Sequence, residues 1–138
     1  MKDFVMNTPR DAVRFGIIGT GRVAQLHAEA MTRIPGAALV AAWNRTPETC
    51  TDFCKAYGGK QFTEVDELLA DTEIDAVIVA TISGTHYHHA KRALLAGKHV
   101  MVEKPIAVSV EEIEDLEKIA AATGRVCFPS HNYIYYET

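Results

Sequence analysis

The sequence predicts an α/β fold: a doubly wound parallel sheet with helices on both faces, in three layers. Apolar runs that suit strands alternate along the chain with helical patterns, and short connections join them. The first run, residues 13–18, passes through Gly19-Thr20-Gly21 directly into a helical pattern. Because crossovers between parallel strands are right-handed, this alternation predicts one sheet with the strand order 3-2-1-4-5-6.

Length and composition indicate one globular domain. The chain has 138 residues, of which 48% are hydrophobic and 23% are charged, with a formal net charge of -4. A net negative charge without a basic tract argues against a nucleic-acid partner. No apolar run approaches the ~20 residues of a membrane helix, and residues 1–10 lack the apolar core of a signal peptide. We therefore expect a cytoplasmic protein with no membrane partner and with a flexible leader over 1–10.

The first half of the chain predicts two helices and two further strands. A helix is expected over 23–34, and the run 37–43 suits a strand covered on both faces. A second helix over 47–57, with Thr46 as its N-cap, precedes a short strand over 60–62. The helical spacing places one stripe of the first helix inward: Val23, Leu26, His27, Ala30, Met31 and Ile34.

The second half continues the alternation. Its elements in order are a helix over 66–70, a strand over 74–81, a loop over 82–85, a helix over 86–96, a strand over 98–102 and a sixth strand over 125–129. The run 74–81 is rich in Val and Ile and is expected beside the first strand. Between the last two strands, Ser109 and Glu112 form a capping box that opens a helix ending at Gly124. This helix directs four residues inward: Val110, Ile113, Leu116 and Ala120.

The turn after the first strand matches the dinucleotide-binding fingerprint G-x-G-x-x-G/A. Gly19 permits a tight turn, Gly21 lets the backbone approach a pyrophosphate, and Ala24 takes the third small position. The free N–H groups and the positive dipole end of the following helix would face the anion. The pattern therefore predicts a Rossmann-type dinucleotide-binding domain over 11–138.

Ligands bind sheets of this kind at the carboxyl ends of the strands. In this sequence, polar residues follow five of the predicted strands at that edge. The segments concerned are Gly19 to Val23, Asn44 to Thr46, Thr81 to Thr85, Glu103 to Pro105, and His131.

Three motifs on this edge carry a resemblance to a known family. They are Gly19-x-Gly21 after the first strand, Asn44-Arg45 after the second, and Gly97-Lys98-His99-Val100-x-x-Glu103-Lys104-Pro105 around the fifth. Over nearly its whole length the chain resembles the Gfo/Idh/MocA oxidoreductases, the relatives of glucose-fructose oxidoreductase and inositol dehydrogenase. His27 and His86 stand where this family often has histidine, whereas Ile82 and Ser83 replace its usual Pro-Asn.

The resemblance implies an oxidoreductase that uses NAD or NADP to transfer hydride to or from a carbinol carbon of a sugar, inositol or related polyol. Family members continue into a C-terminal α+β substrate domain that supplies an Asp and a His, and these 138 residues hold no such domain. This chain alone is therefore expected to bind the cofactor with little or no turnover, and to bind a polyol only if a second domain is supplied. The implied cofactor-binding residues are Gly19, Thr20, Gly21, Arg22, Val23, Asn44, Arg45, Thr46, Thr81, His86, Glu103, Lys104 and Pro105.

Lys104 is the candidate catalytic residue. Hydride transfer needs the nicotinamide close to a carbinol carbon, and a group that takes or gives the hydroxyl proton. An ammonium at a strand end can hydrogen-bond the substrate oxygen. Pro105 is expected to fix the turn that aims Lys104, through a cis bond, and Glu103 to hold this lysine or the nicotinamide ribose. The alternative is a surface ion pair before a turn.

The end of the second strand bears on the choice of cofactor. NAD sites usually place Asp or Glu here to accept the ribose 2'-hydroxyl, but Asn44 is neutral and Arg45 follows it. A 2'-phosphate could take charge-assisted hydrogen bonds from Arg45, with the Thr46 hydroxyl adding another. The pattern favours NADP over NAD. In the alternative, Arg45 stacks on the adenine and NAD binds through Asn44.

Two other patterns are typical of metal or redox sites, and neither is favoured. His86 and His89 are spaced i, i+3 but lack a third ligand, so we expect no metal. Cys50 and Cys54 lie one helical turn apart, and three cysteines in all form no zinc pattern. Reduced thiols in a helix are the favoured interpretation.

Two function classes remain open beside the leading one, which is the cofactor-binding half of an NAD(P)-dependent dehydrogenase. A non-catalytic dinucleotide-binding or sensing module would pair with another chain or form a homo-oligomer through the aromatic segment 133–136. That segment also suits the beginning of a second domain. A methyl-donor site, as in methyltransferases, shares the glycine turn but leaves Glu103-Lys104-Pro105 unexplained.

Overall fold

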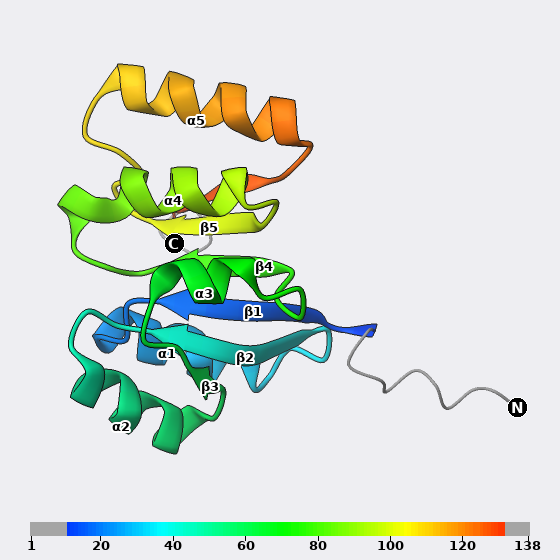
Figure 1. Cartoon of the computed structure of the whole chain (residues 1–138), viewed down its shortest axis with the longest axis vertical. Helices are drawn as coiled ribbons and strands as arrows, with labels where there is room; N and C mark the ends of the chain where they lie inside the picture. Colours follow the sequence, from blue (N-terminus) through cyan, green and yellow to red (C-terminus); the bar gives the residue numbers. More distant parts are fainter. Residues whose placement is uncertain (1–10, 132–138) are drawn as a thin grey trace, which may run out of the picture.

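The computed structural model describes residues 11–131, and they form one six-stranded parallel sheet with helices on both faces (Figure 1). The strand order is β3-β2-β1-β4-β5-β6, which confirms the predicted order. In chain order the elements are β1 (Val13–Ile18), α1 (Arg22–Met31), β2 (Ala37–Trp43), α2 (Pro47–Tyr57), β3 (Lys60–Gln61), α3 (Val65–Ala70), β4 (Ala76–Val79), the 3-10 helix η3 (Ser83–Thr85), α4 (His86–Leu95), β5 (His99–Glu103), α5 (Val110–Thr123) and β6 (Cys127–Ser130).

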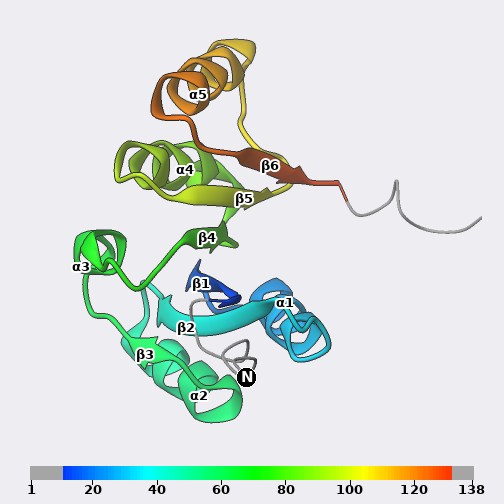
Figure 2. The ribbon, with the colours of Figure 1, turned by 90° about the vertical axis from the view of Figure 1, so that its right-hand side faces the viewer.

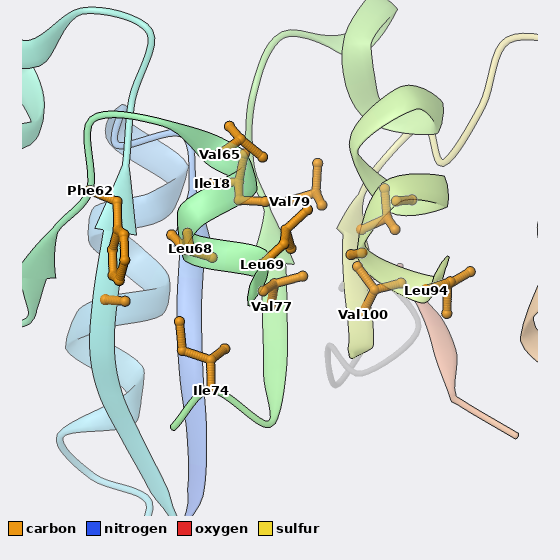
Figure 3. Packing of buried hydrophobic residues seen from close by; sticks show 14 of the residues in the cluster. Ile18, Phe62, Val65, Leu68, Leu69, Ile74, Val77, Val79, Leu94 and Val100 are labelled. Carbon is orange, nitrogen blue, oxygen red and sulfur yellow. The ribbon is translucent and has the colours of Figure 1, made fainter. Parts of the chain in front are cut away.

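Two apolar cores lie on opposite faces of the sheet. The larger one packs α3, α4 and α5 on the sheet, and Leu68, Leu94 and Leu116 of these helices are each at most 1% exposed. Figure 3 shows part of this core, with the side chain of Leu69 beside that of Val77 of β4. The other core holds α1 and α2 against β1 and β2 through Ala28 and Phe53. Figure 2 shows α3 and α4 on one side of the sheet and α1 on the other.

The predicted buried face of the first helix is wrong in part. Val23 and Leu26 are 42% and 57% exposed, whereas Ala24 and Ala28 are buried. Ile34 lies beyond the end of α1 and is exposed. The small side chains face the sheet because they let the helix approach it closely, as the third small position of the fingerprint requires. The larger side chains of Val23 and Leu26 lie instead along the carboxyl edge of the sheet.

The inward face predicted for the last helix is also wrong in part. Leu116 is buried and Ala120 packs against the same core, but Val110 and Ile113 are 65% and 38% exposed. α5 packs on α4 and on the edge strand β6, so its first turn has few neighbours that could bury it. Fewer neighbours at an edge leave more of an amphipathic stripe exposed.

Side-chain capping is confirmed for one of the two predicted helix starts. Ser109 Oγ accepts a hydrogen bond from the Glu112 backbone N–H at 3.2 Å, while the Glu112 carboxylate accepts from the Val108 N–H at 2.9 Å. Thr46 stands at the N-cap of α2, as predicted, but its side chain makes no capping hydrogen bond. No helix within residues 11–131 is long and apolar enough to cross a membrane.

His89 of α4 is a polar side chain inside the fold. It is 8% exposed, and its ring centroid lies 5.8 Å from that of Trp43 of β2. Burial lowers the pKa of His89 to about 4, and positive charge on His88, Arg92 and His86 acts in the same direction. At neutral pH this imidazole is therefore uncharged.

The buried His89 makes folding stability depend on pH. Its pKa is lower in the folded chain than in the unfolded chain. As the pH falls from 6.5 towards 4, His89 therefore binds a proton in the unfolded chain but stays neutral in the folded one, which favours unfolding. The free energy of unfolding should drop by about 3 kcal/mol across that window through this residue alone. Urea denaturation at several pH values checks this: His89→Gln should flatten the profile, and His88→Gln, at an exposed neighbour, should not. Identical profiles for wild type and His89→Gln would contradict the assignment.

Candidate functional site

The glycine turn joins β1 to α1 at the centre of the sheet. Gly19 has a φ of +97°, and a Cβ there would lie 2.5 Å from the carbonyl oxygen of Ala80, so only glycine fits. Gly21 is the N-cap of α1, and a Cβ there would meet nothing within 4 Å. Gly19 is therefore required by the fold, whereas Gly21 keeps open the space above the helix N-terminus.

The start of α1 presents unpaired backbone donors to that open space. The first helical hydrogen bond runs from Gln25 N to Gly21 O at 3.1 Å, so the N–H groups of residues 22–24 precede the helical ladder. The first turn holds no acidic residue. The Thr20 hydroxyl beside it is buried without a hydrogen-bond partner among residues 11–131. These features fit an anionic ligand such as a pyrophosphate.

Asn44 ties the glycine turn to the start of α2. Its Oδ1 accepts a hydrogen bond from Thr20 N at 3.0 Å, and its Nδ2 donates to Thr46 O at 3.1 Å. Sequence reasoning considered Asn44 only as a ligand contact, because this bridge depends on two loops that meet in space. The amide is thus engaged by backbone groups, and the exposed Arg45 side chain stands next to it.

A cavity of about 530 Å³ lies over the turn, between the ends of β2 and β4. It brings together eight of the predicted cofactor-binding residues: Gly19, Gly21, Arg22, Val23, Asn44, Arg45, Thr46 and Thr81. Five further residues line this cavity. Ile82 and Thr85 belong to the segment that the sequence placed on this edge, whereas sequence reasoning missed Trp43, Ala80 and His89. The position of Trp43 as the last residue of a strand was the available signal, because strand ends face the ligand edge.

A second cavity, of about 600 Å³, continues along the same edge over the end of β5. Its walls include the predicted residues Val23, Thr81, His86, Glu103 and Lys104, together with Leu26, His27, Ala80, Ile82, Ser83 and Ser130. The two cavities share Val23, Ala80, Thr81 and Ile82. They therefore form one trough that runs from Arg45 to Lys104 past the start of α1. His131, which the sequence placed on this rim, instead lines a separate hollow with Ile113 and Leu116.

His86 holds two backbone segments at the floor of the second cavity. It is 2% exposed; its Nε2 lies 2.8 Å from Thr81 O after β4, and its Nδ1 lies 2.8 Å from Pro105 O after β5. The Lys104-Pro105 bond is cis, as the sequence led us to expect. His86 thus fixes the turn that follows Lys104, and its role towards a cofactor stays a prediction.

Glu103 and Lys104 occupy the end of β5. Glu103 Oε1 lies 2.7 Å from Nε2 of His27, which reaches it from α1. Lys104 is exposed on the cavity wall, where its side chain can meet a ligand. The trough therefore combines the N–H groups at the start of α1 with a carboxylate, an imidazole and an ammonium group at its other end.

The metal and cysteine patterns noted in the sequence can be compared with the described residues. Within 11–131, no group of three or more His, Cys, Asp or Glu side chains converges as a metal site would require. Burial raises the pKa of the Cys50 thiol to about 12 and also raises that of Cys54, so neither is a thiolate at neutral pH. The aromatic segment 133–136 lies outside the described residues.

Several known proteins are similar to this chain in sequence and in fold. The chain is 38% identical over 122 residues to glucose-6-phosphate 3-dehydrogenase of Bacillus subtilis. The aligned region covers 88% of this chain and 34% of the relative. Biliverdin reductase from Synechocystis, solved with biliverdin and NADP+, matches with a TM-score of 0.85 and 34% identity over 93% of this chain and 40% of that one. GenD2 from gentamicin A biosynthesis, solved with NAD, matches with a TM-score of 0.87 and 31% identity. This match covers 91% of this chain and 36% of that one.

These matches concern one part of longer proteins, because the chain spans about a third of the curated relative and about two fifths or less of the solved ones. Residues 13–131 match the model of an oxidoreductase family with an NAD-binding Rossmann fold. That match covers the whole sheet and both cavities, including the glycine turn and the end of β5. The chain therefore belongs to the Gfo/Idh/MocA family of oxidoreductases.

Proposed function

We propose that this chain binds NADP or NAD along the trough, and that the whole protein transfers hydride between this cofactor and a sugar, inositol or related polyol. The observation that carries the proposal is the joining of two cavities at the start of α1. A dinucleotide has two nucleosides linked by a pyrophosphate, so its shape matches two cavities that meet at an anion-binding helix end. Neighbouring structures solved with NADP+ and with NAD support this choice of ligand.

The direction of the cofactor follows from the two ends of the trough. The cavity beside Trp43 and Arg45 has an aromatic wall and a cation, which suit adenosine and its ribose. The cavity at the end of β5 contains Glu103 and Lys104, which suit polar groups of the nicotinamide riboside and of the substrate. We therefore place the nicotinamide beside Lys104, where the bound cofactor would supply or receive the hydride.

Lys104 is the proposed catalytic residue of this chain. Its exposed ammonium can donate a hydrogen bond to the carbinol or carbonyl oxygen of a substrate in the second cavity. This bond stabilises negative charge on that oxygen as the hydride moves. The substrate itself and any further proton-transfer group belong to the whole protein, so this chain alone should turn over poorly.

NADP is the proposed preference. Asn44 is engaged by the backbone of Thr20 and Thr46, which leaves Arg45 as the exposed side chain beside the expected ribose. A guanidinium forms charge-assisted hydrogen bonds with a phosphate that a hydroxyl cannot match.

Calorimetric titration of the chain with NADP, NAD and ATP tests the proposed function. We expect both dinucleotides to bind and to raise the melting temperature by an amount that grows with the logarithm of ligand excess, with ATP binding more weakly. Assays of polyol oxidation on the same preparation should show little turnover. Failure of both dinucleotides to bind at millimolar concentration would contradict the proposal.

Substitution of the two glycines separates folding from binding. Gly19→Ala should lower the free energy of unfolding by about 3 kcal/mol, because the positive φ and the Ala80 carbonyl both oppose a Cβ. Gly21→Ala should change stability by less than about 1 kcal/mol, because its Cβ meets open space, yet weaken NADP binding by about tenfold or more. Urea denaturation and calorimetry measure the two effects. Unchanged affinity in Gly21→Ala would place the pyrophosphate elsewhere.

Arg45→Ala tests the proposed phosphate contact. It should weaken NADP binding by about tenfold or more while changing NAD binding little, because only NADP carries the 2'-phosphate. Arg22→Ala is the matched control, since Arg22 lines the same cavity at the start of α1 and should affect both cofactors alike. Competition titrations give the ratio of the two affinities. A variant Arg45→Ala that keeps the wild-type ratio would exclude the phosphate contact.

A further inference from the structure

The hydrogen bond between His27 and Glu103 joins a helix and a strand that are distant in the sequence. His27 lies on α1, which follows β1, and Glu103 ends β5, with β4 between these two strands. Nε2 of the histidine lies 2.7 Å from Oε1 of the glutamate across 76 residues of sequence. The bond therefore crosses the end of β4, where the two cavities of the trough meet.

Both partners are shielded but still reach the cavity. The side chains of His27 and Glu103 are 20% and 16% exposed, and both line the cavity that contains Lys104. Leaving a shielded carboxylate without a hydrogen-bond donor costs free energy. The hydrogen bond from His27 therefore fixes the direction of the Glu103 side chain. The second oxygen, Oε2, makes no hydrogen bond within residues 11–131 and remains available to a ligand.

The helix that carries His27 is also the helix that starts at the glycine turn. His27 lies five residues after Arg22, the first residue of α1, which is about 8 Å along the helix axis. One rigid element thus presents backbone N–H groups to the pyrophosphate and a ring nitrogen to Glu103. The spacing between the phosphate site and the carboxylate is set through this helix.

We infer that His27 is a positioning residue that holds the Glu103 carboxylate for the ribose next to the nicotinamide. A ribose presents two neighbouring hydroxyl groups, and Oε2 of a carboxylate held in place by Nε2 of His27 accepts from them. The inference rests on the proposed function, because it requires a nicotinamide dinucleotide in the trough. It assigns to His27 an effect on one half of the cofactor only.

The experiment compares each cofactor with a fragment that lacks the nicotinamide and the ribose that carries it. The ligands are NADP with 2'-phospho-ADP, and NAD with ADP, titrated by calorimetry. His27→Leu removes the donor, and His27→Gln restores an N–H of similar reach without an ionisable ring. His99→Leu is the matched control, because His99 is also partly buried with one hydrogen bond, to the Val126 N–H at the opposite edge of the sheet.

We expect His27→Leu to weaken the dinucleotide by about tenfold and His27→Gln to restore most of the affinity. Because ADP and 2'-phospho-ADP lack the second ribose, they bind through the adenosine and its two phosphates and should lose much less. Equal losses for dinucleotide and fragment, or no loss at all, would overturn the inference. If the wild type binds neither ligand, the proposed function itself fails.

A second variant covers the case in which His27→Leu does not fold. Glu103→Gln keeps the size of the side chain and one acceptor oxygen but removes the charge that ribose hydroxyls favour. It should weaken the dinucleotide more than the fragment. Wild-type affinity for the dinucleotide in this variant would also overturn the inference.

Discussion

The close contact between the glycine turn and the end of β4 is the constraint on which the site depends. Gly19 lies against the Ala80 carbonyl with no room for a side chain, and its N–H donates to Trp43 O at 2.8 Å. Ala80 N in turn donates to Ile18 O at 2.8 Å. From β1 the chain adds β2 and β3 on one side of the sheet, and then β4, β5 and β6 on the other. The connections on the two sides therefore run in opposite directions, which opens a crevice at the carboxyl end of β1. The trough is that crevice, and the glycine allows its walls to meet.

Polar side chains hold the loops around this crevice. Asn44 bonds the two loops that follow β1 and β2, His86 bonds the segments after β4 and β5, and His27 bonds α1 to Glu103. Each bond satisfies groups that would otherwise be shielded from water without partners. Loops at a ligand edge have little apolar packing of their own. Hydrogen bonds from side chains therefore replace packing there and hold the chain next to Arg45 and Lys104.

Sequence reasoning was sufficient for the fold because the decisive signals are local. The alternation of strands and helices and the glycine fingerprint define the order of the sheet. The choice of which face of α1 is buried does not depend on local sequence alone. Two apolar stripes compete on this helix, and the sequence favoured the one with larger side chains, although the close approach of helix to sheet selects Ala24 and Ala28. The bonds of Asn44 and His86 escaped prediction because their acceptors and donors are backbone groups from distant loops.

The family motif around β5 combines two tasks at opposite edges of the sheet. Lys98 is buried before the strand, and its ammonium donates to Asp71 O and Ile74 O, both at 2.7 Å. Burial lowers the pKa of Lys98, although the carboxylates of Asp71 and Asp75 oppose the shift. These contacts hold the chain that leads into β4, whereas Glu103 and Lys104 lie about 16 Å further on, one strand length away. The spacing between Lys98 and Lys104 in the motif is therefore set by the length of β5. This strand connects the buried Lys98 to Lys104 on the cavity wall.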